Sequence, residues 1–231
     1  MKTFVRRTLA MCLVAPVLAA AAPAFADDAA AGPWQVKLFY TAVIPDGKIS
    51  KVEQTTLTGP LVSAPQTYAS DNAFTPTLAV EYFFTPNVSV ETIAGVTAHH
   101  VGGAGSLAGT ALIDHVLIVP ATLTVKYHLP LGPIKPYVGV GPTWFIVGGE
   151  RPGADALALG VTRTKLSSDV GVAVQAGVDI PIGKSPYSLS FDAKKYWVDT
   201  TANFYAGSAD VLTTKNKLDP WVLSAGVAYR F

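Results

Sequence analysis

Four residues at the ends of two consecutive predicted strands have side chains that bind metal ions. His99 and His100 end one strand, and Asp114 and His115 begin the next, so the hairpin brings the four side chains near one another. Imidazole nitrogens and carboxylates are common ligands of zinc and related ions. The segment between them, VGGAGSLAGTALI, gives such a site no rigidity, and histidines at a hairpin rim are more often simply solvated. We therefore predict no bound metal.

The same hairpin contains the residue types of a hydrolase. Ser106, His99 and Asp114 could act as nucleophile, base and orienting acid. Such catalysis needs the three groups within hydrogen-bond reach of one another. A flexible, glycine-rich loop is a weak place to hold them. The sequence therefore predicts neither an enzyme nor a cofactor.

The beginning of the chain has the pattern of a secretory signal. Three basic residues precede an uncharged run that begins at Thr8 and ends in the small-residue triplet AFA. This arrangement suits a signal peptidase. We predict that residues 1–26 are a cleaved signal peptide and that residues 27–231 form one barrel domain.

The mature chain has neither a thiol nor a strong charge bias. The only cysteine, Cys12, lies in the signal, which leaves no disulfide and no thiolate chemistry. Three of the 17 basic residues and none of the 16 acidic residues also lie there, so the mature net charge is 14 − 16 = −2. This balance, together with the lack of a basic run, argues against a nucleic-acid partner.

Alternation of apolar and polar residues recurs eight times after the signal, and helical periodicity persists nowhere. Alternation with a period of two residues is typical of strands with one apolar face. In the clearest case, DVGVAVQAGVDI, every second residue from Val170 to Ile180 is apolar. The predicted strands span 34–44, 74–84, 88–98, 116–129, 136–147, 169–180, 187–197 and 221–231.

The connections between these strands alternate in length. Long ones span 45–73, 99–115, 148–168 and 199–220, and short ones span 85–87, 129–135 and 181–186. Membrane barrels have this pattern, with short inner turns and long outer loops. No segment of the mature chain reaches the 18 or so uninterrupted apolar residues of a spanning helix, so a barrel is the remaining way to cross a membrane.

The alternation leaves open whether the apolar face contacts lipid or lines the pocket of a lipocalin-like soluble barrel. Two features favour lipid. The opposite face carries Gly, Ala, Ser and Thr with single charges, as suits a narrow barrel filled by its own side chains. Aromatic residues also collect at strand ends, as in the girdles at membrane interfaces. They are Trp34, Tyr82, Phe84, Tyr127, Tyr187, Trp221, Tyr229 and Phe231. The predicted fold is all-β, an eight-stranded antiparallel transmembrane β-barrel with short periplasmic turns and long extracellular loops.

Several blocks of the mature chain resemble those of a known family. The runs PTLAVEYFF, PATLTVKYHL, PYVGVGPTWF, GVAVQAGVDIPI and LDPWVLSAGVAYRF are similar, in this order, to blocks of the OmpW family of small outer-membrane barrels. The resemblance implies an eight-stranded barrel in the outer membrane of a Gram-negative bacterium. It also implies insertion by an assembly machinery that reads the terminal aromatic strand, here Tyr229 and Phe231. The family is associated with passage of small hydrophobic molecules.

Two residue sets are candidates for a role in such passage. Eight charged residues are expected to face the lumen: Glu81, Glu91, Lys126, Asp169, Asp179, Asp192, Lys194 and Arg230. They could select a cargo, although charge pairing that plugs a narrow barrel is the favoured interpretation. Unusually apolar loop residues are expected to form a hydrophobic mouth. These are Leu57, Leu61, Val62, Leu107, Leu157 and Leu159.

The sequence thus predicts a passive channel or binding conduit for small hydrophobic solutes, which could leave sideways into the lipid. Its expected partners are outer-membrane lipid, such solutes and the assembly machinery. The alternative is a structural or interaction barrel whose loops bind an external partner without transport.

Overall fold

The computed structural model describes residues 32–56, 68–70, 73–103, 109–129 and 131–231, and the predicted signal peptide lies outside them. Fourteen strands and one short helix follow one another along this part of the chain. They are β1 (Trp34–Ile44), β2 (Lys48–Thr55), β3 (Tyr68–Ser70), β4 (Ala73–Phe83), β5 (Val88–Ala94), β6 (Thr97–Gly103), β7 (Ala111–His128), β8 (Lys135–Pro152), α1 (Ala154–Ala158), β9 (Arg163–Leu166), β10 (Asp169–Pro181), β11 (Tyr187–Trp197), β12 (Asp199–Ala206), β13 (Ala209–Lys217) and β14 (Trp221–Arg230).

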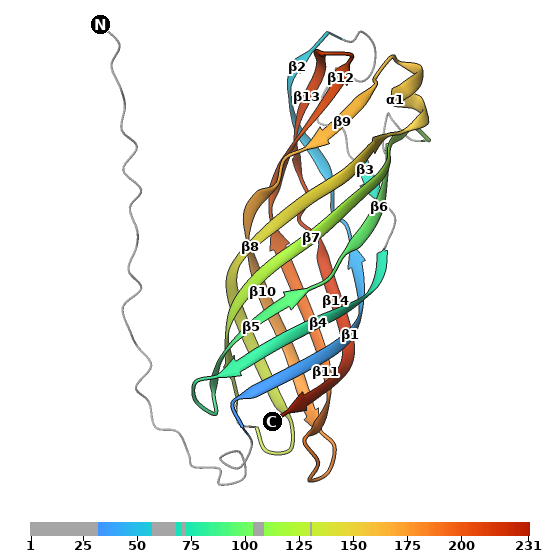
Figure 1. The fold of residues 1–231 in the computed structure, drawn as a ribbon. Helices are drawn as coiled ribbons and strands as arrows, with labels where there is room; N and C mark the ends of the chain where they lie inside the picture. Colours follow the sequence, from blue (N-terminus) through green and yellow to red (C-terminus); the bar gives the residue numbers. More distant parts are fainter. Residues whose placement is uncertain (1–31, 57–67, 71–72, 104–108, 130) are drawn as a thin grey trace, which may run out of the picture.

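Eight of these strands close into one antiparallel barrel, shown in Figure 1. The ring runs in the order β1-β4-β5-β7-β8-β10-β11-β14 and returns to β1. The closing pair extends from Gln35↔Arg230 to Ile44↔Trp221. Beyond it, Trp34 and Phe231 exchange backbone hydrogen bonds of 3.1 and 2.8 Å. The predicted eight-stranded barrel is therefore confirmed.

Residue parity decides which side chains face outward. Along β1, Leu38 and Tyr40 are 62% and 64% exposed, whereas Lys37, Phe39 and Thr41 are at most 2% exposed. The other barrel strands alternate in the same way, and their outward residues are mostly apolar. Together these outward residues form the lipid belt, a surface suited to contact with hydrocarbon.

Aromatic side chains mark the two edges of the lipid belt. Trp34 and Tyr229 are exposed at the inner, periplasmic end, and the Tyr229 ring centre lies 5.1 Å from that of Tyr187. Trp197 and Trp221 are exposed at the outer, extracellular end. Rings of this kind are typical of the two membrane interfaces.

The outer connections contain more strand than the sequence predicted. The extensions β2, β3, β9, β12 and β13 lie in segments predicted as loops, and β2-β13-β12-β9 form a separate four-stranded sheet at the outer end (Figure 1). The loop predictions for 45–73, 148–168 and 199–220 were wrong to that extent, and so was that for 99–115, because β6 runs to Gly103 and β7 begins at Ala111. The predicted single strand 88–98 is divided between β5 and β6. Pairing of β13 with β2 shifts register twice, and such bulges interrupt a period-two pattern. Among the described residues, no helix is long and apolar enough to cross a membrane.

Candidate functional site

Seven charged side chains gather inside the inner half of the barrel, and we call them the ion cluster. Six strands, β1, β4, β5, β7, β10 and β11, place them at inward positions, where each residue is at most 5% exposed. They are Lys37, Lys126, Lys194, Glu81, Glu91, Asp179 and Asp192. Because charges are costly to bury unless they are paired, the contacts within this group decide whether the barrel is stable.

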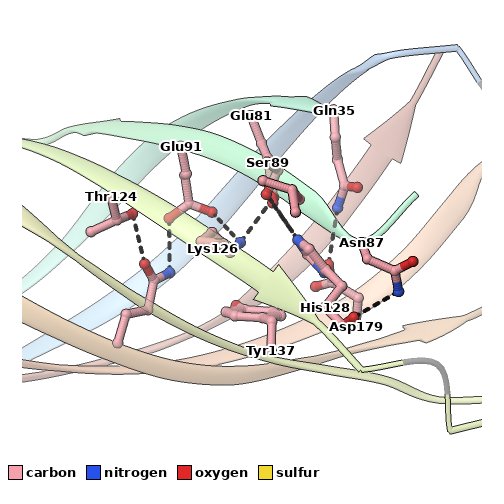
Figure 2. Close-up of polar contacts among 12 residues, drawn as sticks. Gln35, Glu81, Asn87, Ser89, Glu91, Thr124, Lys126, His128, Tyr137 and Asp179 are labelled. Atoms are coloured by element: carbon pink, nitrogen blue, oxygen red, sulfur yellow. Dashed lines mark hydrogen bonds and ion pairs between the residues drawn. The ribbon is translucent and has the colours of Figure 1, made fainter. Parts of the chain in front are cut away.

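Lys126 lies between two carboxylates at the centre of the ion cluster. Its Nζ is 2.9 Å from Oε2 of Glu81 and 2.8 Å from Oε2 of Glu91 (Figure 2). The two glutamates are directly opposite each other on β4 and β5, where like charges repel. The lysine therefore stabilises a pair of carboxylates that would otherwise be unfavourable.

Lys37 and Lys194 extend the ion cluster to either side. Lys37 Nζ is 2.9 Å from Oδ2 of Asp179, and Lys194 Nζ is 2.7 Å from Oδ1 of Asp192. Lys37 Nζ also lies 3.1 Å from Glu81 and 3.7 Å from Glu91, and Lys194 Nζ lies 3.2 Å from Glu91. Three ammonium groups and four carboxylates thus form one connected network.

Neutral side chains supply further hydrogen bonds to the ion cluster. Gln175 donates to Glu91 at 2.9 Å and to Asp192 at 2.6 Å, and it accepts from Thr124 at 2.8 Å. Near the inner end, Ser89 donates to Glu81 at 2.5 Å. Carboxylates that accept several hydrogen bonds are held in one position, so the network fills the lumen as a rigid plug.

Tyr137 packs against the ammonium groups from β8. The Lys126 Nζ lies 3.7 Å from the centre of its ring, and the Tyr137 hydroxyl donates to Asp192 at 2.8 Å. Gly177 makes room for it, because a Cβ added there would lie 2.4 Å from the hydroxyl oxygen. The ring therefore adds a cation–π contact to the ammonium group of Lys126.

The sequence-predicted lumen set and the ion cluster overlap in part. Six predicted residues lie in the cluster: Glu81, Glu91, Lys126, Asp179, Asp192 and Lys194. Asp169 lies far above them at the start of β10, where Ser167 donates to it. Arg230 lies at the inner end of β14, with its guanidinium 3.8 Å from the centre of the Phe83 ring.

Sequence reasoning left out two members of this interior. Lys37 alternates with the apolar Val36 and Leu38 but was not among the predicted lumen charges. Tyr137 has the parity of Gly139 and Gly141, which face inward with it. In both cases the alternation of the sequence already indicated an inward position.

A layer of buried hydroxyl groups, which we call the hydroxyl layer, lies on the extracellular side of the ion cluster. Thr41 Oγ1 is 2.6 Å from Thr77 Oγ1 and 2.9 Å from Ser224 Oγ, and Thr122 Oγ1 is 2.7 Å from Thr143 Oγ1. All five residues are buried. Because hydroxyls both donate and accept, these groups satisfy one another and separate the charges from the space above.

The outer half of the barrel encloses an apolar cavity. The cavity has a volume of about 140 Å³, counted as the space that the centres of water molecules could occupy. Thr41, Thr77 and Tyr196 are among the residues that line it next to the hydroxyl layer, and apolar side chains form most of the rest. Those apolar residues include Ile93, Ile113, Val116, Phe145, Leu166 and Phe204. This space suits an apolar molecule, while the plug below it obstructs an ion.

The barrel wall beside the cavity is interrupted at one place. The ladder between β4 and β5 ends at Leu78↔Ala94. Further toward the outer end, the next ladder joins β3 to β6 and begins at Ser70↔Val101. Among the described residues in between, Thr75 donates its hydroxyl to the carbonyl of Val96 at 3.0 Å, but no ladder joins the two edges. We call this interruption the wall break. Thr75, Thr77, Gly95 and Thr97 border it and also line the cavity.

The predicted mouth is described only in part. Leu159, 52% exposed just after α1, lines the cavity, and Leu157 is 55% exposed on α1. Leu57, Leu61, Val62 and Leu107 lie outside the described residues.

His99 and His100 of the predicted rim face opposite sides of the wall. His99 is buried, with Nε2 2.9 Å from the hydroxyl of Thr97, whereas His100 is exposed. Ser106 lies outside the described residues. Within the described part of the chain, no group of three His, Cys, Asp or Glu side chains is placed to hold a metal ion.

The chain matches the model of the OmpW family over residues 30–231. It is 29% identical to an uncharacterized outer-membrane protein, y4mB, of Sinorhizobium fredii over 89% of this chain and 83% of that protein. It is 30% identical to outer membrane protein W of Escherichia coli over 67% of this chain and 71% of that one. Its fold is similar to that of the crystal structure of OprG from Pseudomonas aeruginosa, with a TM-score of 0.73 and 23% identity over 87% of this chain and 96% of that one. The chain therefore belongs to the OmpW family and is an outer-membrane β-barrel.

Proposed function

We propose that this barrel is a passive conduit for small, uncharged hydrophobic molecules. The observation that carries the proposal is the apolar cavity in the outer half, set above a lumen that the hydroxyl layer and the ion cluster fill. An apolar solute would gain free energy on entering the cavity from water. It could not continue inward past seven buried charges.

The wall break supplies a route out of the cavity. Because β4 and the segment after β5 are not joined by a ladder there, separation of the described edges breaks the hydrogen bond from the Thr75 side chain to Val96 but no backbone ladder. Thr77 and Gly95, which lie on opposite sides of the wall break, both line the cavity. The solute would then leave sideways into the hydrocarbon, where it is more soluble than in the periplasm.

The test is uptake of an uncharged hydrophobic fluorophore into proteoliposomes. Ala202→Phe adds a ring inside the cavity, which Ala202 lines from β12, and we expect uptake to fall about tenfold. The control is Ala176→Phe, which adds the same ring on the lipid side of β10 and should leave uptake unchanged. Heat-dependent gel mobility checks that both variants are folded. Equal uptake by wild type and Ala202→Phe would contradict the conduit and favour a structural barrel.

The mouth is part of the same proposal. We expect Leu159→Asn to lower uptake several-fold in this assay, because it places an amide where the solute enters. Leu157→Asn should have a smaller effect, since Leu157 is not among the described residues that line the cavity. The mouth assignment fails if neither variant changes uptake.

Tyr229 and Phe231 are proposed as the signal that the assembly machinery reads. Their rings stack at the inner edge of the lipid belt, with centres 5.5 Å apart. We expect Phe231→Ala to reduce the amount of folded barrel in isolated outer membranes several-fold, while refolding of the purified chain into detergent changes little. Normal membrane levels of the variant would remove Phe231 from this role.

A further inference from the structure

The exposed face of the four-stranded sheet β2-β13-β12-β9 carries two pairs of lysines, and the two lysines of each pair lie opposite each other. In the β2–β13 register, Lys48 is the partner of Lys217 and Lys51 is the partner of Lys215. All four side chains are exposed. Like charges directly opposite on antiparallel strands destabilise the pair, so this arrangement is unfavourable unless an anion lies between them.

Two carboxylates offset part of this charge. On β12, the exposed Asp199 is the register partner of Lys217. Glu53 Oε1 is 3.0 Å from Nζ of Lys215 and 3.7 Å from Nζ of Lys51. The hydrogen bond from Lys215 holds the pKa of Glu53 below its ordinary value, so this carboxylate is ionised at neutral pH. The other lysine pair, Lys48 and Lys217, lies at the opposite end of the register from Glu53.

The wider face is basic as well. On β9, the exposed residues Lys165 and Arg163 add two positive charges. Asp199 on β12 and Asp210 on β13 add two negative charges. With the four lysines and Glu53, the described face has six basic and three acidic residues, or 6 − 3 = +3. The whole mature chain, by contrast, has a net charge of −2. This face is therefore more basic than the chain as a whole.

This basic patch, Lys48, Lys51, Lys215 and Lys217, lies just above the outer edge of the lipid belt. Lys48 follows the exposed Ile44 by four residues, and Lys217 precedes the exposed Trp221 by four. Residues 45–47 and 218–220 lie between strands, and four residues of extended, tilted chain rise at most about 10 Å along the membrane normal. This rise places the lysine Cα atoms at or just above the headgroup region, which is roughly 5–8 Å thick, and the long lysine side chains can reach back into it. A lipid whose chains contact Trp221 would place a charged headgroup beside these lysines.

We propose that the basic patch binds the phosphorylated headgroup of a lipid in the outer leaflet, with a phosphate between Lys48 and Lys217. Ammonium groups bind phosphate as point charges, and a shared phosphate turns the repulsion within the pair into attraction. This site is on the outside of the barrel and does not depend on transport through the cavity. Simple solvation by counterions, or capture of free phosphate, are the competing outcomes.

The test measures binding of a purified, phosphorylated outer-leaflet glycolipid to the folded mature protein in uncharged detergent. Lys48→Gln/Lys217→Gln is compared with Lys135→Gln/Lys184→Gln, which removes two positive charges at the periplasmic end. A surface lysine near anionic lipid contributes enough that losing two should weaken binding at least tenfold. The periplasmic variant should bind like wild type, and added salt should weaken wild-type binding.

Two further arms distinguish the sources of phosphate. The same lipid after enzymatic removal of its phosphates should bind wild type and the Lys48→Gln/Lys217→Gln variant equally weakly. Inorganic phosphate at matched concentration should compete poorly. Without lipid, this variant should melt at the same temperature as wild type or higher, because the repulsion is gone. The proposal is overturned if the variant binds the phosphorylated lipid as tightly as wild type, or if inorganic phosphate competes fully.

Discussion

Replacing Lys126 with methionine should lower the free energy of unfolding of the barrel by about 3–5 kcal/mol. The lysine Nζ contacts both Glu81 and Glu91 at less than 3 Å, and all three side chains are at most 1% exposed. Methionine fills similar space but leaves the opposed carboxylates with Lys37 and Lys194 as their cationic partners. The measurement is equilibrium unfolding by guanidinium in detergent or lipid, followed by tryptophan fluorescence.

Two variants make this result specific to charge. Lys184→Met, in the exposed turn after β10, should change the free energy of unfolding by less than about 0.5 kcal/mol. Adding Glu91→Gln to Lys126→Met removes one of the unbalanced carboxylate charges and should restore part of the loss. A loss below about 1 kcal/mol for Lys126→Met would show that the ion cluster contributes little to stability.

Joining the two sides of the wall break should stop lateral exit. A Cβ added at Gly95 would lie 3.4 Å from the Cβ of Thr77, close to the roughly 3.5–4.5 Å of a disulfide. The mature chain has no cysteine of its own once the predicted signal is removed. We expect oxidised Thr77→Cys/Gly95→Cys barrels to take up the hydrophobic fluorophore at least tenfold more slowly than the same barrels after reduction.

The reducing agent provides the first control, because it restores the route in the same protein. A second cysteine pair, Ala176→Cys/Ala193→Cys, joins β10 to β11, where an intact ladder already holds the wall. Its oxidation should not alter uptake. If the oxidised wall-break pair transports at the reduced rate, the solute leaves by another path, and the lateral part of the proposed function is wrong.

The sequence predicted the barrel because membrane strands have one face in lipid and one in a packed lumen. That contrast alternates at every residue, so it places Leu38 and Tyr40 outside and Thr41 inside without any long-range information. It also placed Glu81, Lys126 and Lys194 on inward positions. The resemblance to the family blocks and the alternating loop lengths indicated a membrane barrel as well.

Parity does not determine how far along the barrel a residue lies. Asp169 and Asp179 have the same parity on β10, yet Asp179 joins the ion cluster and Asp169 begins the strand at the other end. Which charges meet depends on the register between strands, and the sequence does not determine that register. The outer extensions were missed for a related reason. Between Lys48 and Lys51 the chain bulges, so two exposed lysines follow each other at an odd spacing.

The outermost hairpin is a suitable place for a reporter peptide. β12 and β13 are joined by Gly207 and Ser208 alone, both exposed, and Gly207 has a φ of +63°. This tip stands at the far outer end of the molecule (Figure 1), away from the ion cluster. Exposed turns of this kind tolerate insertions. An epitope spliced between these two residues would therefore be displayed to antibodies on intact cells, and it would report topology without disturbing the barrel.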